Sequence, residues 1–241
     1  MQFNKLIAQT TLLIILITQI LQADECALIS TSRPGAANPT SSVSFGLYQF
    51  EMATNLSTSQ GTDNTFNIPA LLRMGIYKNT ELQVAYASQY LTLGVLYGGI
   101  SIIDGLENSI IFTTSMTKNI DSLTEYSAYF PISYKLNNDF SVWGQASGTV
   151  INTDSSNPVI SYSLAIGKSL GEKTSWFLET YQSIIKDQDD PSISIDGGFT
   201  YLSDKTVQFD ISMGVTFDKI DNTYKESSRF IEWGFSFRRP R

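Results

Sequence analysis

The stretch Val207-Gln-Phe-Asp-Ile-Ser-Met-Gly-Val-Thr-Phe217 has an apolar side chain at every second position, with Gln, Asp, Ser, Gly and Thr between them. Successive side chains of a strand point to opposite faces, so this stretch predicts a strand with one apolar and one polar face. Residues 140–150 repeat the pattern, and similar segments follow one another from about Ser42 to the end of the chain. The repetition predicts an all-β fold, a closed antiparallel up-and-down β-barrel.

About twelve strands are expected. Their predicted ranges are 43–53, 66–77, 80–92, 94–103, 107–117, 124–136, 139–151, 159–169, 173–185, 192–202, 206–217 and 229–238. An even number of strands is typical of bacterial single-chain barrels. Most of these segments reach the roughly 9–11 residues that a tilted membrane strand needs, whereas strands of soluble proteins average about 5–6 residues.

The expected connections alternate between short and long. Tight turns are predicted at Lys78-Asn79, Asp104-Gly105, Asn137-Asn138, Gly171-Glu172 and Asp204-Lys205, and longer polar loops at 54–65, 118–123, 151–158, 186–191 and 218–228. One predicted connection, at Leu93-Gly94, is too short for this scheme. Short turns on one side and longer loops on the other are typical of outer-membrane barrels. The pattern therefore predicts a transmembrane barrel in the outer membrane of a Gram-negative bacterium.

The N-terminal residues predict export. Lys5 precedes a mostly apolar stretch that ends near Ala23, which is typical of a cleaved signal peptide. A membrane anchor is the less favoured alternative, because the stretch is short and interrupted by polar residues. The expected organisation is a signal peptide at 1–23, a periplasmic lead-in segment at 24–41 and the barrel at 42–241.

Composition limits the chemistry. The chain has 241 residues, no histidine, one cysteine and a formal net charge of -7. The absence of histidine excludes Ser-His-Asp catalysis and histidine-ligated metals, and no basic cluster suggests nucleic acid. The run Lys186 to Pro191 lacks the glycine and distal glutamate of a calcium loop. We therefore expect no enzyme, cofactor or metal site, although an acid pair such as Asp187 and Asp189 remains an alternative base.

Charged residues recur on the polar faces of the predicted strands. The set that we expect in the lumen is Glu51, Arg73, Glu81, Lys135, Glu179, Asp196, Asp210, Glu232 and Arg238, together with the aromatic residues Tyr129 and Trp143. An Arg or Lys facing lipid at the membrane midplane would cost about 2–4 kcal/mol, which favours the interior.

Two interpretations of these charges stay open. They could form an acidic constriction that selects solutes, or interior ion pairs that fix the register of the strands. For Glu51, Arg73 and Glu81 we favour ion pairing, because carboxylates satisfy a partly desolvated guanidinium. Closure of the barrel is expected to bring Arg238 beside Glu51.

Several segments, in order along the mature chain, resemble a known family. They are Thr31-Ser-Arg-Pro-Gly35, Tyr48-Gln-Phe-Glu-Met52, Leu71-Leu-Arg-Met-Gly-Ile76, Thr80-Glu-Leu-Gln-Val84, Pro131-Ile-Ser-Tyr-Lys-Leu136, Phe177-Leu-Glu-Thr-Tyr181, Asp196-Gly-Gly-Phe-Thr-Tyr-Leu202, Val207-Gln-Phe-Asp-Ile-Ser-Met-Gly214 and Gly234-Phe-Ser-Phe-Arg238. Together they are similar to the outer-membrane transporter family associated with the meta-pathway of phenol degradation. The resemblance implies a twelve-strand-type barrel that moves small, often hydrophobic, compounds. The chain departs from the common barrel ending, since Phe237 is followed by Arg238, Arg239, Pro240 and Arg241.

The predicted function is passive permeation of small, hydrophobic or aromatic solutes through a narrow polar lumen. The alternative is a structural or adhesive outer-membrane barrel without transport activity. The expected partners are outer-membrane lipid, the barrel assembly machinery that reads the C-terminal strand, and a small-molecule solute. The oligomeric state is not indicated.

Overall fold

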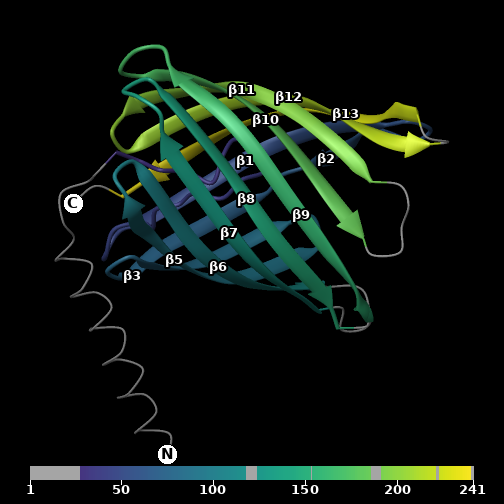
Figure 1. Cartoon of the computed structure of the whole chain (residues 1–241), viewed down its shortest axis with the longest axis horizontal. Coiled ribbons are helices and arrows are strands. Elements are labelled where there is room, and N and C mark those ends of the chain that lie inside the picture. The colour runs from purple at the N-terminus through teal and green to yellow at the C-terminus, as the bar shows by residue number, and fades with distance from the viewer. Residues whose placement is uncertain (1–27, 118–123, 153, 186–190, 221–222, 240–241) are drawn as a thin grey trace, which may run out of the picture.

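The described strands form one antiparallel sheet that closes on itself (Figure 1). The computed structural model describes residues 28–117, 124–152, 154–185, 191–220 and 223–239. The strands are β1 (Tyr48–Ser59), β2 (Thr65–Asn67), β3 (Ala70–Tyr77), β4 (Thr80–Ala87), β5 (Tyr90–Ile103), β6 (Leu106–Thr117), β7 (Thr124–Lys135), β8 (Phe140–Ile151), β9 (Asp154–Ser169), β10 (Thr174–Ile185), β11 (Ser192–Asp204), β12 (Val207–Ile220) and β13 (Thr223–Arg238). From β3 onward each strand pairs with the next one in sequence, β1 pairs with both β2 and β3, and β13 pairs with β1 to close the barrel.

Strands β2 and β3 occupy one position in the barrel. Both pair with β1, β2 through Asn55–Ser57 and β3 through Tyr48–Met52. The break between them falls at Ile68-Pro69, where proline has no N–H to donate to the ladder. Twelve strand positions therefore surround the lumen, and the predicted up-and-down barrel of about twelve strands is confirmed.

The two faces of the sheet have opposite chemistry. On β12, the side chains of Gln208, Asp210 and Ser212 are buried, while those of Phe209 and Ile211 are exposed on the outside. The same alternation recurs around the barrel, so that large apolar side chains cover the outer surface. The described residues contain no helix long and apolar enough to span a membrane.

Several predicted strand boundaries are wrong. Residues 43–47 are not strand, and the connection between β4 and β5 is Ser88-Gln89 rather than Leu93-Gly94. Ser88 has a φ of 53°, which is a turn conformation that the apolar pattern of this region did not reveal.

The loop lengths also differ from the prediction. Much of the predicted loops 54–65, 151–158 and 218–228 is strand, because these residues pair across β1, β8, β9, β12 and β13. Polar side chains on both faces hid the strands at this end of the barrel. The predicted signal peptide at 1–23, the single cysteine Cys26, the loop 118–123 and the acids Asp187 and Asp189 lie outside the described residues.

Candidate functional site

An irregular segment, residues 28–47, crosses the inside of the barrel; we call it the lumen segment. The amide of Ser32 donates to Glu51 on β1 at 2.9 Å. The amide of Asn38 donates to Gln145 on β8 at 3.0 Å, almost on the opposite wall. We expected this part of the chain as a lead-in on the periplasmic side of the barrel. Its described residues lie within the lumen instead, because its backbone and side chains hydrogen-bond to the polar inner face.

Arg73 of β3 is the centre of the polar network on this wall. Its side chain is 0% exposed, and Glu51 and Glu81 are equally buried. Nε donates to Glu81 Oε1 at 2.7 Å, Nη2 donates to Glu81 Oε2 at 2.9 Å, and Nη1 donates to Glu51 at 3.2 Å. The fork of the guanidinium thus meets one carboxylate with two bonds and the other with one, which compensates for the removal of three charges from water.

Arg73 also binds both ends of a loop in the lumen segment. It donates to the carbonyl oxygen of Ser30 at 2.7 Å and to that of Ser41 at 3.1 Å. The hydroxyl of Ser41 donates to the hydroxyl of Ser30 at 3.1 Å. Residues 30–41 therefore form a loop whose ends meet, as in an Ω-loop; we call it the lumen loop. One buried arginine holds its two ends against the wall.

Gly75 of β3 allows the chain to approach the wall after the lumen loop. A Cβ atom added at Gly75 would lie 2.1 Å from the carbonyl oxygen of Ser44 and 2.5 Å from that of Val43. The backbone of Gly75 also pairs with Gly46 and Leu47, through bonds of 2.9 Å and 3.1 Å. Only a residue without a side chain fits this close backbone contact.

Substituting Gly75 by alanine should therefore destabilise the barrel by about 1–3 kcal/mol, the usual cost of overpacking. The urea midpoint of the detergent-solubilised protein measures this loss. Gly148→Ala on β8 is the matched control, because a Cβ there meets nothing within 4 Å, and its effect should stay within about 0.5 kcal/mol. Equal midpoints for the two variants would contradict this account.

A second set of contacts anchors the middle of the lumen loop. Arg33 Nη2 lies 3.1 Å from Asp210 of β12 and 2.8 Å from Glu232 of β13. The amides of Ala36 and Ala37 both donate to the carboxylate of Glu179 on β10, the second at 3.1 Å. The loop is thus attached to β12 and β13, next to the β1 seam, and to β10 further around the barrel, through charged hydrogen bonds, which are stronger than neutral ones.

The seam between β13 and β1 differs in one detail from the prediction. Arg238 lies opposite Gln49, not Glu51, and donates to its side-chain oxygen at 3.0 and 2.8 Å. Gln49 in turn donates to Glu51 at 2.8 Å. Arg238 therefore joins the Arg73 network through an intervening glutamine. Its partner on β1 is two residues away from the predicted one, because the pattern of a strand does not determine its register against a neighbouring strand.

The other predicted lumen residues lie at different places around the barrel. Lys135 is exposed at the end of β7, apart from the Arg73 network, and Tyr129 is half-buried on the inner face of the same strand. Trp143 of β8 lines a cavity beside the lumen loop. Asp196 of β11 is buried opposite Glu179 in the paired strands.

Sequence reasoning missed Arg33, Ser30 and Ser41, because the lumen loop has no strand or helix periodicity. One signal was present in the sequence. Arg33 is the single charged residue between Glu25 and Glu51, and the predicted lumen carried an excess of acids that required a cation.

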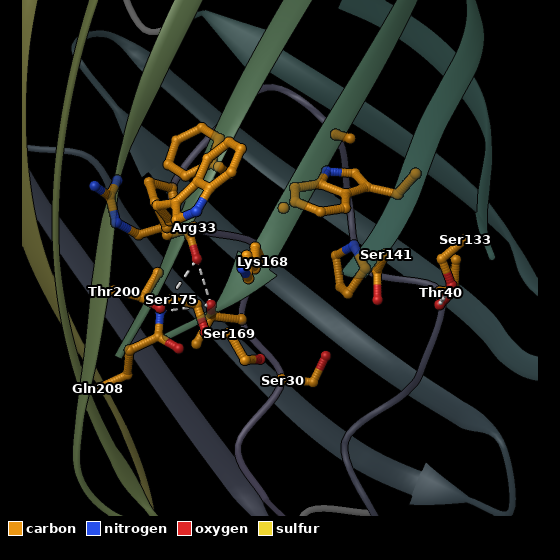
Figure 2. A pocket seen from close by; sticks show the side chains of 18 of the residues that line it. Ser30, Arg33, Thr40, Ser133, Ser141, Lys168, Ser169, Ser175, Thr200 and Gln208 are labelled. Atoms are coloured by element: carbon orange, nitrogen blue, oxygen red, sulfur yellow. Dashed lines mark hydrogen bonds between the residues drawn. The ribbon is translucent and has the colours of Figure 1, made fainter. Parts of the chain in front are cut away.

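The lumen loop separates two cavities. One has a volume of about 310 Å³ and reaches Asp139 and Ser169 at the tight-turn end. Figure 2 shows Arg33 and Gln208 on one side of it, Ser141, Ser133 and Thr40 on the other, and Ser30 of the lumen loop below. The second cavity, about 370 Å³, lies toward the opposite end and is lined by Asn55, Ser57 and Ser228 among others. Residues 33–37 contribute to one lining or the other, so this stretch lies between the two cavities.

Comparison with known proteins agrees with the fold. The sequence profile of a family described as "Putative MetA-pathway of phenol degradation" matches residues 111–238. No curated protein matches the sequence. The NanC porin is 11% identical with a TM-score of 0.60, over 78% of this chain and 98% of that one. The KdgM porin is 11% identical with a TM-score of 0.57, over the same shares of 78% and 98%. The CymD monoaromatic hydrocarbon channel is 9% identical with a TM-score of 0.55, over 81% of this chain and 88% of that one.

Proposed function

This chain belongs to the MetA-pathway phenol-degradation family, and from that membership we propose that it is an outer-membrane channel for small solutes. Its function is permeation through the barrel, along a path that the lumen loop narrows. The observation that carries the proposal is the combination of an apolar outer surface with a polar lumen that holds a cavity on each side of the lumen loop.

The outer surface supports a location in lipid. Exposed side chains such as Phe130, Leu164 and Trp233 point away from the lumen on separate strands. So much exposed apolar area is unusual for a protein in water and is normal for the outside of a transmembrane barrel. Membrane fractionation tests the location of the protein, and a gel mobility that changes on heating tests for a folded barrel. Recovery of a folded chain from detergent-free extracts would contradict the proposal.

The size of the lumen supports small solutes. Barrels of about eight strands are filled by side chains, and those of about sixteen or more leave an open aqueous channel. Twelve positions lie between these limits, and the lumen segment occupies part of the remaining space. A cavity of about 310 Å³ lined by Trp143, Pro34 and Phe177 among others suits compact, partly apolar molecules. The resemblance in fold to a monoaromatic hydrocarbon channel is consistent with this class of solute.

Planar bilayers test the channel directly. The native protein should give small, discrete conductance steps, because the lumen loop leaves only narrow passages. Arg33→Ala removes the bonds to Asp210 and Glu232, and should therefore raise the mean conductance or the frequency of open events, by up to about twofold if only the middle of the loop is released.

The control for this measurement is Arg229→Ala. Arg229 also forms an ion pair, with Glu226, but its side chain is 71% exposed. Exposed pairs of this kind contribute little, so the conductance of this variant should equal that of the native protein. A silent bilayer for the native protein and for both variants would favour the structural or adhesive alternative over a channel.

A further inference from the structure

We propose that the cavity of about 370 Å³ beside the lumen loop, lined by Asp196, Glu232, Tyr181 and Phe230, binds the protonated amine of a small aromatic or apolar solute. This inference rests on the proposed function, since the ligand is one of the permeating solutes. It goes further by naming the charge and the chemical class that the lumen selects.

The first argument is the balance of charge around this cavity. Glu232 and Asp210 share the single cation Arg33. Glu179 is satisfied by the two backbone amides of the lumen loop, and Asp196 lies opposite Glu179 across the β10–β11 pair. Two of these four carboxylates, Asp196 and Glu232, line the cavity, and Arg33 is the one guanidinium that pairs with any of the four among the described residues. Rings of Asp and Glu side chains favour cations in channels.

The second argument is an unsatisfied carboxylate. Asp196 is 4% exposed and lines the cavity, and its Oδ1 atom has no hydrogen-bond partner in the described part of the chain. Most buried polar atoms do have partners, so an exception in a cavity points to a ligand, an ion or water. An ammonium group offers three N–H donors and a positive charge, which would satisfy Asp196 and still reach Glu232.

The third argument concerns the body of the ligand. Tyr181 and Phe230 place two aromatic rings in the same lining. The ring of Phe230 lies over Gly214, where an added Cβ would come within 2.5 Å of it, and this fixes the ring beside Asp196. Aromatic faces attract ammonium groups and pack against apolar carbon. A bare metal ion fits less well, because the described residues contain no group of three or more acid or thiol side chains arranged to hold one.

The cavity has the right scale for such a guest. Small-molecule sites have volumes of about 300–1,000 Å³ and combine apolar walls with a few placed polar groups. Here the polar groups include the two carboxylates, the hydroxyl groups of Ser57, Thr216 and Ser228, and the amide of Asn55, which donates to Glu232 at 3.2 Å and so orients it.

Titration calorimetry on the detergent-solubilised native barrel tests the inference with three matched probes. These are 2-phenylethylammonium, 2-phenylethanol and phenylacetate, which share a phenyl body and differ in charge. The ammonium should bind about tenfold or more tightly than the neutral alcohol, since hydrogen bonds to charged groups are the strong ones. The carboxylate should not bind. Equal binding of ammonium and alcohol, or no binding of the ammonium, would overturn the proposal.

Variants then locate the site. Asp196→Asn keeps the shape of the side chain and removes its charge, and should weaken ammonium binding by about tenfold while binding of the alcohol is unchanged. Glu232→Gln should act in the same direction. Asp104→Asn, an exposed acid in the β5–β6 turn, is the control and should bind as the native protein does. Loss of ammonium binding in the control, or its retention in both other variants, would remove the site from this cavity.

These results can be separated from those that test the channel. Binding in detergent requires no permeation, and conductance in simple salt requires no ammonium site. A protein that conducts without preferring the ammonium overturns this inference alone. A protein that is silent in bilayers overturns the proposed function, whatever it binds.

Discussion

Replacing Arg73 by alanine should destabilise the barrel by about 3–5 kcal/mol, the cost of breaking a buried ion pair from one side. The substitution leaves Glu51 and Glu81 fully buried, without the guanidinium that bonds to both. It also removes the donors that hold the carbonyl oxygens of Ser30 and Ser41. Urea unfolding of the detergent-solubilised barrel, followed by the heat-modifiable gel shift, measures the loss.

Two further variants identify the cause. Arg229→Ala removes an arginine whose ion pair is exposed, and should cost no more than about 1 kcal/mol. The triple variant Arg73→Met, Glu51→Gln, Glu81→Gln removes the uncompensated charges, and should recover a substantial part of the stability. If Arg73→Ala unfolds at the native urea concentration, the network does not stabilise the barrel.

Replacing residues 31–40 by a single glycine should raise the conductance several-fold. The ends of the lumen loop already meet, because the hydroxyl groups of Ser30 and Ser41 are 3.1 Å apart. The excision therefore shortens the chain without pulling on β1 or on the Arg73 network. It removes Arg33 and the stretch that lies between the two cavities. Single-channel recording in planar bilayers gives the result.

Ion selectivity can be measured on the same variant, in which a single glycine replaces residues 31–40. Without Arg33 and the amides of Ala36 and Ala37, the carboxylates of Asp210, Glu232 and Glu179 face an open lumen. The reversal potential in a salt gradient should therefore shift toward cations. Removal of residues 61–63 from the exposed β1–β2 connection is the matched control and should change neither quantity. Native conductance after excision of the lumen loop would show that the loop does not obstruct the path.

The sequence by itself determined the barrel, its approximate strand number and the inner face that carries the charges. The reason is local: alternation along a strand needs no information from elsewhere in the chain. Asp210 and Phe209 fall on opposite faces whatever their neighbours are. Strand ends were less predictable, because residues there, such as Thr54 of β1 and Ser228 of β13, are polar. Whether such residues are in a strand depends on the partner strand with which they pair.

Only the tertiary structure decided what fills the lumen. The lumen loop has no periodic pattern, and it is held by contacts to residues far away in the chain, such as Arg33 with Asp210 and Asn38 with Gln145. Such contacts exist only once the barrel has closed and brought its inner faces around the segment. The register at the seam, which places Arg238 beside Gln49, likewise exists only in the closed barrel. Hydrophobic alternation is a property of neighbouring residues, whereas the partners of a buried charge are chosen by the closed fold.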